Sequence, residues 1–318
     1  MILKAPFPWF GGKSRVASLV WKYFGNVPNY IEPFAGSMAV LLGRPYPPKV
    51  ETVNDADCYL SNFWRALANN PEAVAREANW PVNEADLLAR HKWLLSQSDF
   101  RERMKKDATY YDVRVAGWWV WGLCAWIGQG WCSAEASQLP HLGDAGRGIN
   151  RKLPHLGDAG MDLEHYFCQL ANRLRRVRVS CGDWSRVLGN SVTVKHGITG
   201  IFLDPPYASE RNQSYAVDSK TVADDVREWA IENGENKLFR IALCGYEGEH
   251  VMPESWVEIP WKATGGYGSQ SNKKGRENSA KERIWFSPYC NIRKQMNLFD
   301  MPNHSLNSDA QKVAVRTD

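Results

Sequence analysis

The clearest chemical signal in the sequence is Asp204-Pro205-Pro206-Tyr207, which directly follows the apolar residues 201–203. Prolines cannot continue a hydrogen-bonded strand, and open α/β sheets bind ligands beyond the carboxyl ends of their strands. A carboxylate and a backbone carbonyl there can accept both N–H groups of a planar amine, which helps its nitrogen attack a methyl sulfonium. Tyr207 can stack on a base rotated out of a duplex. The alternative interpretation is a strand that simply ends in a proline turn.

Two sets of predicted strands would place this motif in one sheet. Residues 28–60 contain a strand at 30–31, a turn with glycine at 33–37, a short helix and a second strand at 50–53. This order is typical of a βαβ unit. The further predicted strands alternate with helical stretches such as 220–233, and they cover residues 177–180, 200–203, 238–244 and 283–286. The predicted fold class is therefore α/β, with a doubly wound sheet.

The predicted strands are separated by a long insertion over residues 61–165. Its first part has a helical pattern, and its later part is rich in glycine and tryptophan. The eight residues Leu-Pro-His-Leu-Gly-Asp-Ala-Gly occur at 139–146 and again unchanged at 153–160. Two copies cannot form a solenoid, and their Gly, Pro and Asp content favours a loop or ribbon. The polar residues 291–318 are expected to form a flexible tail.

Composition excludes several classes of protein. The 318 residues are 44% hydrophobic and 23% charged, with a net charge of +4. No apolar run is long enough to span a bilayer, and the first residues lack a signal peptide, so a cytoplasmic location is expected. The seven cysteines include no Cys-x-x-Cys pair and are expected to be reduced. No histidine has metal-ligand spacing, so no metal site is expected.

Three motifs in this order resemble Dam-type, alpha-group DNA adenine-N6 methyltransferases. They are Trp9-Phe10-Gly11-Gly12-Lys13, Tyr30-Ile31-Glu32-Pro33-Phe34-Ala35-Gly36 and Asp204-Pro205-Pro206-Tyr207. The resemblance implies a site-specific enzyme that transfers methyl from S-adenosyl-L-methionine to a flipped adenine in double-stranded DNA. It also implies a Rossmann-like methyltransferase core, cofactor-binding over residues 1–60 and catalytic over 166–290. The insertion at 61–165 would then be a mainly helical target-recognition domain.

The resemblance assigns cofactor contacts to Trp9, Gly11, Gly12, Lys13, Glu32, Pro33, Phe34, Gly36, Asp55, Asp183, Trp184 and Asp204. Lys13 would lie near the methionine carboxylate, and Asp55 would receive the ribose hydroxyls, with Asp57 as a rival. Asp183 and Trp184 would bind the adenine. An aspartate at a strand end is also a common helix cap. Met38 departs from the family, which usually has glycine there; its side chain would either crowd the cofactor or enter the helix–sheet interface.

Candidate DNA contacts carry side chains that reach base edges or phosphates. They are Arg114, Gln129, Arg147, Asn150, Arg151, Lys152, Lys273, Lys274 and Arg276. Residues 147–152, between the repeated octapeptides, are the preferred candidates for sequence recognition. Charged loops are often merely solvated, and that alternative stays open here. The tryptophans at 118, 119, 121, 126 and 131 have helical spacing, which favours core packing over stacking on DNA.

Two other functions compete with this interpretation. The first is methylation of another planar amine, such as RNA adenine or cytosine N4, although the relatives acting on cytosine typically begin the motif with Ser rather than Asp. The second is a non-catalytic DNA-binding relative, a hypothesis that Met38 motivates. The enzyme is expected to be a monomer or homodimer, associated with a bacterial nucleoid. Gln295-Met296-Asn297-Leu298-Phe299 matches the spacing of peptides that dock into the bacterial sliding clamp, which makes the clamp a candidate partner.

Overall fold

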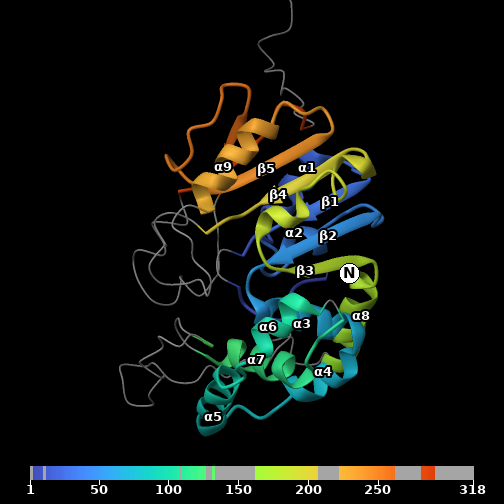
Figure 1. Ribbon diagram of the computed structural model, residues 1–318, viewed down its shortest axis with the longest axis vertical. Helices are drawn as coiled ribbons and strands as arrows, with labels where there is room; N and C mark the ends of the chain where they lie inside the picture. The colour runs from blue at the N-terminus through green and yellow to red at the C-terminus, as the bar shows by residue number, and fades with distance from the viewer. Residues whose placement is uncertain are drawn as a thin grey trace, which may run out of the picture.

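The computed structural model describes residues 3–9, 12–107, 109–126, 131–132, 162–206, 222–261 and 281–290 (Figure 1). Within these ranges one sheet runs through the molecule, with strand order β3-β2-β1-β4-β5-β7-β6. Its strands are β1 (Asn29–Glu32), β2 (Val50–Asp55), β3 (Val177–Cys181), β4 (Thr199–Leu203), β5 (Phe239–Tyr246), β6 (Val257–Pro260) and β7 (Glu282–Phe286). Strands β1 to β5 pair in parallel, and β7 is antiparallel to both β5 and β6.

Both faces of the sheet are covered, because the central strands are apolar on both sides. Tyr30 and Phe202 belong to one core cluster, together with residues of α1 (Ala17–Phe24). Ile31 and Ile201, their neighbours in sequence, belong to a second cluster with residues of α9 (Val222–Asn233). Alternating side chains point to opposite faces of a strand, so α1 and α9 cover different faces. The predicted doubly wound α/β sheet is confirmed.

A group of helices lies at the β3 edge of the sheet (Figure 1). It contains α3 (Cys58–Asn69), α4 (Pro71–Ala78), α5 (Glu84–Leu95), α6 (Phe100–Lys106), α7 (Val113–Ala125) and α8 (Leu163–Leu174), whereas the short α2 (Ala39–Leu42) follows β1. Polar caps begin several of these helices: Asp57 accepts the Tyr59 N–H of α3, and Asp112 accepts the Val115 N–H of α7. Such caps satisfy backbone donors that have no partner within the helix.

Tryptophan packing holds this helical group together. Trp119, Trp121 and Trp126 are buried, and Trp118 and Trp131 are partly buried against the core. Trp131 donates its indole N–H to the Trp119 carbonyl at 3.0 Å. The prediction that these residues pack rather than offer stacking surfaces is confirmed for the three buried ones.

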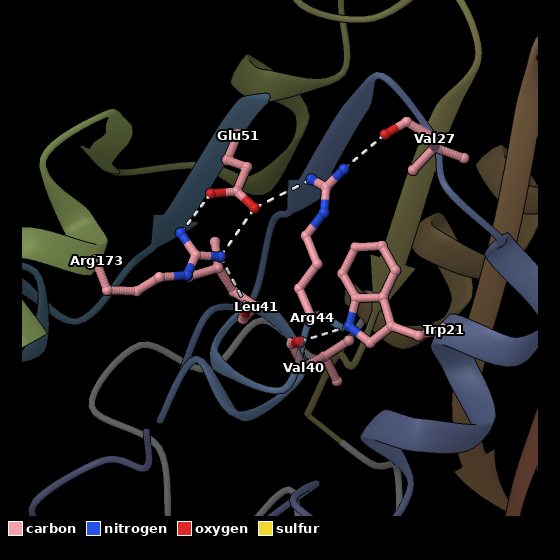
Figure 2. A network of polar contacts seen from close by, with 7 residues as sticks. All are labelled: Trp21, Val27, Val40, Leu41, Arg44, Glu51 and Arg173. Atoms are coloured by element: carbon pink, nitrogen blue, oxygen red, sulfur yellow. Dashed lines mark hydrogen bonds and ion pairs between the residues drawn. The ribbon is translucent and has the colours of Figure 1, made fainter. Parts of the chain in front are cut away.

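A buried ionic network fastens α8 to the sheet, at the end of the strands where β2 begins (Figure 2). Glu51 of β2 accepts from Arg173 of α8 at 2.6 and 2.9 Å and from Arg44 at 3.1 Å. The two arginines also donate to backbone carbonyls, Arg173 to Leu41 at 3.0 Å and Arg44 to Val27 at 2.7 Å. The network therefore joins α8 to the first βαβ unit.

In the described parts of the chain, no helix has the length and apolarity needed to cross a membrane. All seven cysteines are free thiols, six of them buried. The sequence-based interpretation missed β6, whose side chains alternate between partly buried and exposed positions.

Candidate active site

Charged residues from separate segments meet at the carboxyl ends of β1 and β4. Strand order reverses between these two strands, and Ile31 pairs with Ile201 in their ladder. Glu32 ends β1, and Asp204 follows β4 directly. The Nζ atom of Lys13, which precedes α1, lies 3.0 Å from Oδ1 of Asp204. Open α/β sheets bind ligands at such a reversal point, so these residues define the candidate site.

Lys13 is a buried cation in this site, with a side chain only 6% exposed. Burial opposes its charge, but the carboxylates of Asp204 and Glu282 outweigh burial and raise the pKa of Lys13 above its ordinary value. The face of Trp261 lies 5.4 Å from Nζ, a cation–π arrangement. Lys13 therefore stays protonated over the physiological range and gives Asp204 a permanent positive neighbour.

Glu32 differs from Asp204 because it forms no ion pair with another described residue. Its carboxyl is buried, and within the described residues Oε2 has no hydrogen-bond partner. Burial, together with the negative charge of Asp204, raises the pKa of Glu32 well above its ordinary value. A buried acceptor left in this state is costly unless a ligand supplies a donor, so Glu32 marks a position suited to an ammonium group.

The turn after β1 brings the first two sequence motifs together at Gly36. Its φ of +46° is one that glycine adopts easily, and a Cβ there would lie 2.6 Å from Trp9 Nε1. The Gly36 carbonyl accepts from Trp64 Nε1 at 3.1 Å, and its N–H donates to Asp55 Oδ2 at 3.0 Å. A larger residue would clash with the Trp9 indole at this position, so glycine lets Trp9 pack directly against the turn.

Met38 lies outside the candidate site. Its side chain is fully buried in the core cluster below α2, and its φ of 51° is left-handed. Of the two orientations considered from the sequence, the one into the helix–sheet interface is therefore observed. Methionine pays a small backbone cost in this conformation, which suits glycine better.

Asp55 and Asp57 were rival candidates for the ribose acceptor, and their contacts in the structure differ. Asp57 caps α3, whereas Asp55 Oδ1 accepts the Asp57 N–H at 2.9 Å and holds the Gly36 turn through Oδ2. Burial and the charge of Asp57 raise the pKa of Asp55 to about 7, against the effect of these N–H donors. Asp55 is thus an acid at the edge of the turn that titrates near neutral pH.

The residues that follow β3 form another part of the candidate site. The Gly182 N–H donates to the Asp55 carbonyl at 3.0 Å, and Asn54 Nδ2 bridges the carbonyls of Pro33 at 3.1 Å and Gly182 at 2.9 Å. The rings of Phe34 and Trp184 face each other with centroids 6.2 Å apart and planes 24° from parallel. Asn54 was missed from the sequence, because an asparagine at a strand end also suits an ordinary turn.

Asp183 has the capping role that its position allowed. Its Oδ1 accepts the Ser185 N–H at 2.9 Å, which begins the short 3-10 helix η1 (Trp184–Val187). The residue is exposed, so the cap leaves its carboxylate accessible from solvent. Its neighbour Trp184 faces Phe34 in the turn after β1.

The DNA-contact candidates are only partly described. Arg114 is exposed in the first turn of α7, 3.9 Å through Nε from Glu77 Oε1. It borders an open cavity of about 400 Å³ that Trp93, Tyr111 and Asp112 also line. The other DNA-contact candidates are outside the described residues: Gln129, Arg147, Asn150, Arg151, Lys152, Lys273, Lys274 and Arg276. The cofactor candidate Gly11, the catalytic candidate Tyr207 and the clamp segment Gln295 to Phe299 are also outside them.

The amino-terminal part of this site lies in a segment that is similar to a known family. Residues 9–125 match the family model for D12 class N6 adenine-specific DNA methyltransferases. The match starts at Trp9, includes Lys13, Gly36 and Asp55, and ends with α7. It supports DNA adenine-N6 methylation as the reaction, so the chain is an enzyme that needs DNA and a methyl donor. A search of curated proteins finds no match.

Proposed function

We propose that this chain is a site-specific, Dam-type DNA methyltransferase that transfers methyl from S-adenosyl-L-methionine to N6 of an adenine rotated out of the duplex. The observation that carries the proposal is the ion pair of Lys13 with Asp204 at the reversal point of the sheet. It presents a fixed carboxylate at the start of the Asp-Pro-Pro-Tyr motif. The adjacent Gly36 turn contacts Trp9 and Asp55, two of the proposed cofactor contacts.

The chemistry of the surrounding donors fits S-adenosyl-L-methionine, which supplies an electrophilic methyl group on a sulfonium. Glu32, with a buried oxygen that lacks a partner, suits the α-ammonium, and Lys13 suits the α-carboxylate. Asp55 would accept the ribose hydroxyls. The facing rings of Phe34 and Trp184 would pack on the adenine, with Asp183 accepting its amino group. Trp9 and Gly12 would line the same turn.

Asp204 has the central role in the transfer. Its carboxylate and the Pro205 carbonyl would each accept one N6–H of the target base, which localises the nitrogen lone pair for attack. Lys13 holds Oδ1, so the acceptor is oriented before the base arrives. Pro206 fixes the chain beyond it, and Tyr207 would stack on the base.

The activity is tested by incubating purified protein with labelled S-adenosyl-L-methionine and either plasmid DNA or RNA. Mass spectrometry of the digested nucleosides should find N6-methyladenine in DNA alone. N4-methylcytosine, or label in RNA only, would contradict the proposal in favour of another planar amine. Isothermal titration with the cofactor distinguishes an enzyme from a non-catalytic DNA-binding relative. A relative whose cofactor site no longer binds S-adenosyl-L-methionine would give no heat.

Cofactor binding is expected to depend on the ionisation of Asp55. The pKa of Asp55 is raised to about 7 in the folded protein. Its contribution to folding stability is therefore fully present below the pKa that it has in the unfolded chain, and it is lost as the pH rises through 7. Ribose hydroxyls bind the ionised carboxylate of Asp55 better than its protonated form. The dissociation constant of the cofactor should therefore be about tenfold lower at pH 8 than at pH 6. Isothermal titration at the two pH values measures this change.

The control for this dependence is Asp57→Asn, which keeps a good helix cap but removes the charge that raises the pKa of Asp55. The pH at which affinity improves should then move below 7. Equal affinity at pH 6 and pH 8 in the unaltered protein would refute the assignment of Asp55 to the ribose.

Sequence recognition is assigned to the insertion at 61–165, with its preferred contacts at 147–152. Replacing Arg147, Asn150, Arg151 and Lys152 by Ala should relax or abolish site preference and leave cofactor affinity unchanged. Long-read sequencing of DNA from a host expressing each protein measures the methylated motif. An unaltered motif in the quadruple variant would show that other residues recognise the sequence, and Arg114 and Gln129 are the next candidates. Lys273, Lys274 and Arg276 are proposed as phosphate contacts.

A partner is proposed for Gln295 to Phe299. A peptide covering residues 290–302 should bind purified bacterial sliding clamp with micromolar affinity, since Leu and Phe suit an apolar groove and Gln a polar anchor. Fluorescence polarisation checks this, with Leu298→Ala and Phe299→Ala together as the control. Absence of binding by the unaltered peptide would remove the clamp as a partner and leave the methyltransferase proposal unaffected.

A further inference from the structure

Two of the buried thiols, Cys58 and Cys181, lie in contact beside the candidate site. Their Sγ atoms are 3.5 Å apart, and the residues are 4% and 2% exposed. Cys58 is the first residue of α3, and Cys181 is the last residue of β3. Because 123 positions of the chain separate them, the packing of α3 against β3 brings the two sulfurs together.

The thiol pair lies between two turns that carry proposed cofactor contacts. Cys181 is opposite Asp55 in the parallel β2–β3 ladder, and the following residue, Gly182, donates its N–H to the Asp55 carbonyl at 3.0 Å. The turn that begins at Asp55 ends at Cys58. The turn that begins at Cys181 leads to Trp184. A displacement of either sulfur therefore acts on a residue proposed to contact the ribose or the adenine.

The surroundings of the pair favour a thiolate at Cys181. The Cys58 thiol donates a hydrogen bond to the Cys181 sulfur, and this bond lowers the pKa of Cys181 although burial opposes the charge. The Ser61 hydroxyl and the charge of Arg65 lower this pKa further. The same hydrogen bond raises the pKa of Cys58. A thiolate is the form of cysteine that attacks oxidants, so Cys181 is the nucleophile of the pair and Cys58 is the thiol within its reach.

We propose that Cys58 and Cys181 are an oxidation site, where a small peroxide joins the two sulfurs in a disulfide and thereby weakens cofactor binding. The effect on the cofactor rests on the proposed function, whereas formation of the bond does not. Burial of both sulfurs favours a small oxidant, such as hydrogen peroxide, over a bulky one such as oxidised glutathione.

The reaction consumes one peroxide and releases two waters. The Cys181 thiolate attacks one oxygen of hydrogen peroxide, the O–O bond breaks, and the leaving hydroxide takes up the proton that Cys181 released. The Cys58 sulfur then attacks the resulting sulfenic acid, the S–S bond forms and the S–O bond breaks. The hydroxide that leaves takes the Cys58 proton. Two electrons pass from the thiols to the peroxide, so no further reactant is needed.

The new bond changes the position of both turns. A disulfide is about 2.05 Å long, so the sulfurs must approach by about 1.5 Å from their separation of 3.5 Å. Hydrogen bonds hold the backbone on either side. Asp57 caps α3 by accepting the Tyr59 N–H at 2.8 Å, and Arg186 donates to the Cys181 carbonyl at 2.6 Å. The approach therefore displaces the turns next to the pair, and a misplacement of about 1 Å can cost a site about 100-fold.

Cys168 is the matched control for reactivity, because it is the more exposed thiol. It is half-buried on α8, and its Sγ lies 3.8 Å from Glu72 Oε1. Folded full-length protein is treated with hydrogen peroxide, its remaining thiols are alkylated, and mass spectrometry of the digest maps the oxidised positions. The peptides of Cys58 and Cys181 should be linked at peroxide concentrations that leave Cys168 alkylated, and dithiothreitol should release them. Oxidation of Cys168 with no linkage of the pair would overturn the proposal.

Calorimetric titration with S-adenosyl-L-methionine measures the consequence for binding. Peroxide should raise the dissociation constant at least about tenfold in the unaltered protein and in Cys168→Ser, and dithiothreitol should reverse the change. Cys58→Ser cannot form the bond, so its affinity should stay that of the reduced protein. Cys181→Ala serves the same purpose if Cys58→Ser does not fold. A linked protein with unchanged affinity, or an equal loss of affinity in Cys58→Ser, would refute the regulatory role.

The two measurements distinguish this inference from the proposed function. Linkage of the thiols is mapped without cofactor or DNA, so it tests the oxidation site by itself. A protein that links Cys58 to Cys181 but binds no S-adenosyl-L-methionine in its reduced form would refute the proposed function and support the oxidation site. A protein that binds the cofactor and methylates adenine but never forms the linkage would refute the oxidation site alone.

Discussion

Asp204→Ala is expected to lower the rate of methyl transfer at least about 10³-fold, because the variant loses the acceptor that activates N6. DNA affinity should stay the same or rise slightly, since phosphate contacts dominate it and a negative charge is removed. Cofactor binding should also persist. Single-turnover methylation with labelled donor, together with gel-shift and calorimetric titrations, measures these three quantities.

Two comparisons make this expectation specific. Asp204→Asn preserves volume next to Lys13 but presents an amide, and it should be almost as inactive as Asp204→Ala. Asp99→Asn removes an exposed carboxylate in the helical group and should keep full activity. Turnover within tenfold of normal in Asp204→Asn would exclude the carboxylate from the chemistry. Simultaneous loss of cofactor binding and thermal stability would instead indicate that the ion pair with Lys13 has a structural role.

Glu51→Ala is expected to have the largest effect on stability. It deprives Arg44 and Arg173 of their shared partner in a site where the side chains of Arg44 and Glu51 are 0% and 1% exposed. Removing one member of a buried ionic group costs about 3–5 kcal/mol, since the remaining charges stay desolvated. Urea unfolding followed by tryptophan fluorescence measures the change in the free energy of unfolding.

An exposed ion pair provides the control for that measurement. Glu102 pairs with Lys106 on α6, and their side chains are 64% and 74% exposed. Glu102→Ala should leave the free energy of unfolding nearly unchanged, because exposed ion pairs contribute little to stability. If Glu51→Ala destabilises the protein no more than Glu102→Ala does, the buried network contributes nothing beyond its packing.

The sequence predicted those parts of the fold in which local pattern and tertiary position agree. Strands β1 and β4 are short apolar runs that end in turn residues, and both were predicted with their chemical groups at the correct ends. Strand β6 was missed because its alternating exposure resembles that of a loop with scattered apolar residues. Its neighbour Trp261 was missed with it.

The sequence predicted the residues of the candidate site that belong to its motifs, but it did not predict the contacts between them. Lys13 and Asp204 were both named from the sequence, but their ion pair was not, because it depends on how two segments 191 positions apart meet (204 minus 13). Glu282 carried no signal at all, because a glutamate at the start of a strand is ordinarily solvated. Only the register of β7 against β5 brings it into a buried position.

The packing of α7 and α8 has a consequence for how this chain can change during evolution. Both helices pack against α3 and α4, so the chain leaves the helical group at Ala125 and resumes at Leu163 on the same packed body. Closing a loop between fixed ends costs only about 0.6 kcal/mol for each doubling of its length. Segments of different length and content can therefore be exchanged between these helices without refolding the core, and a copied octapeptide such as the one at 153–160 can be retained.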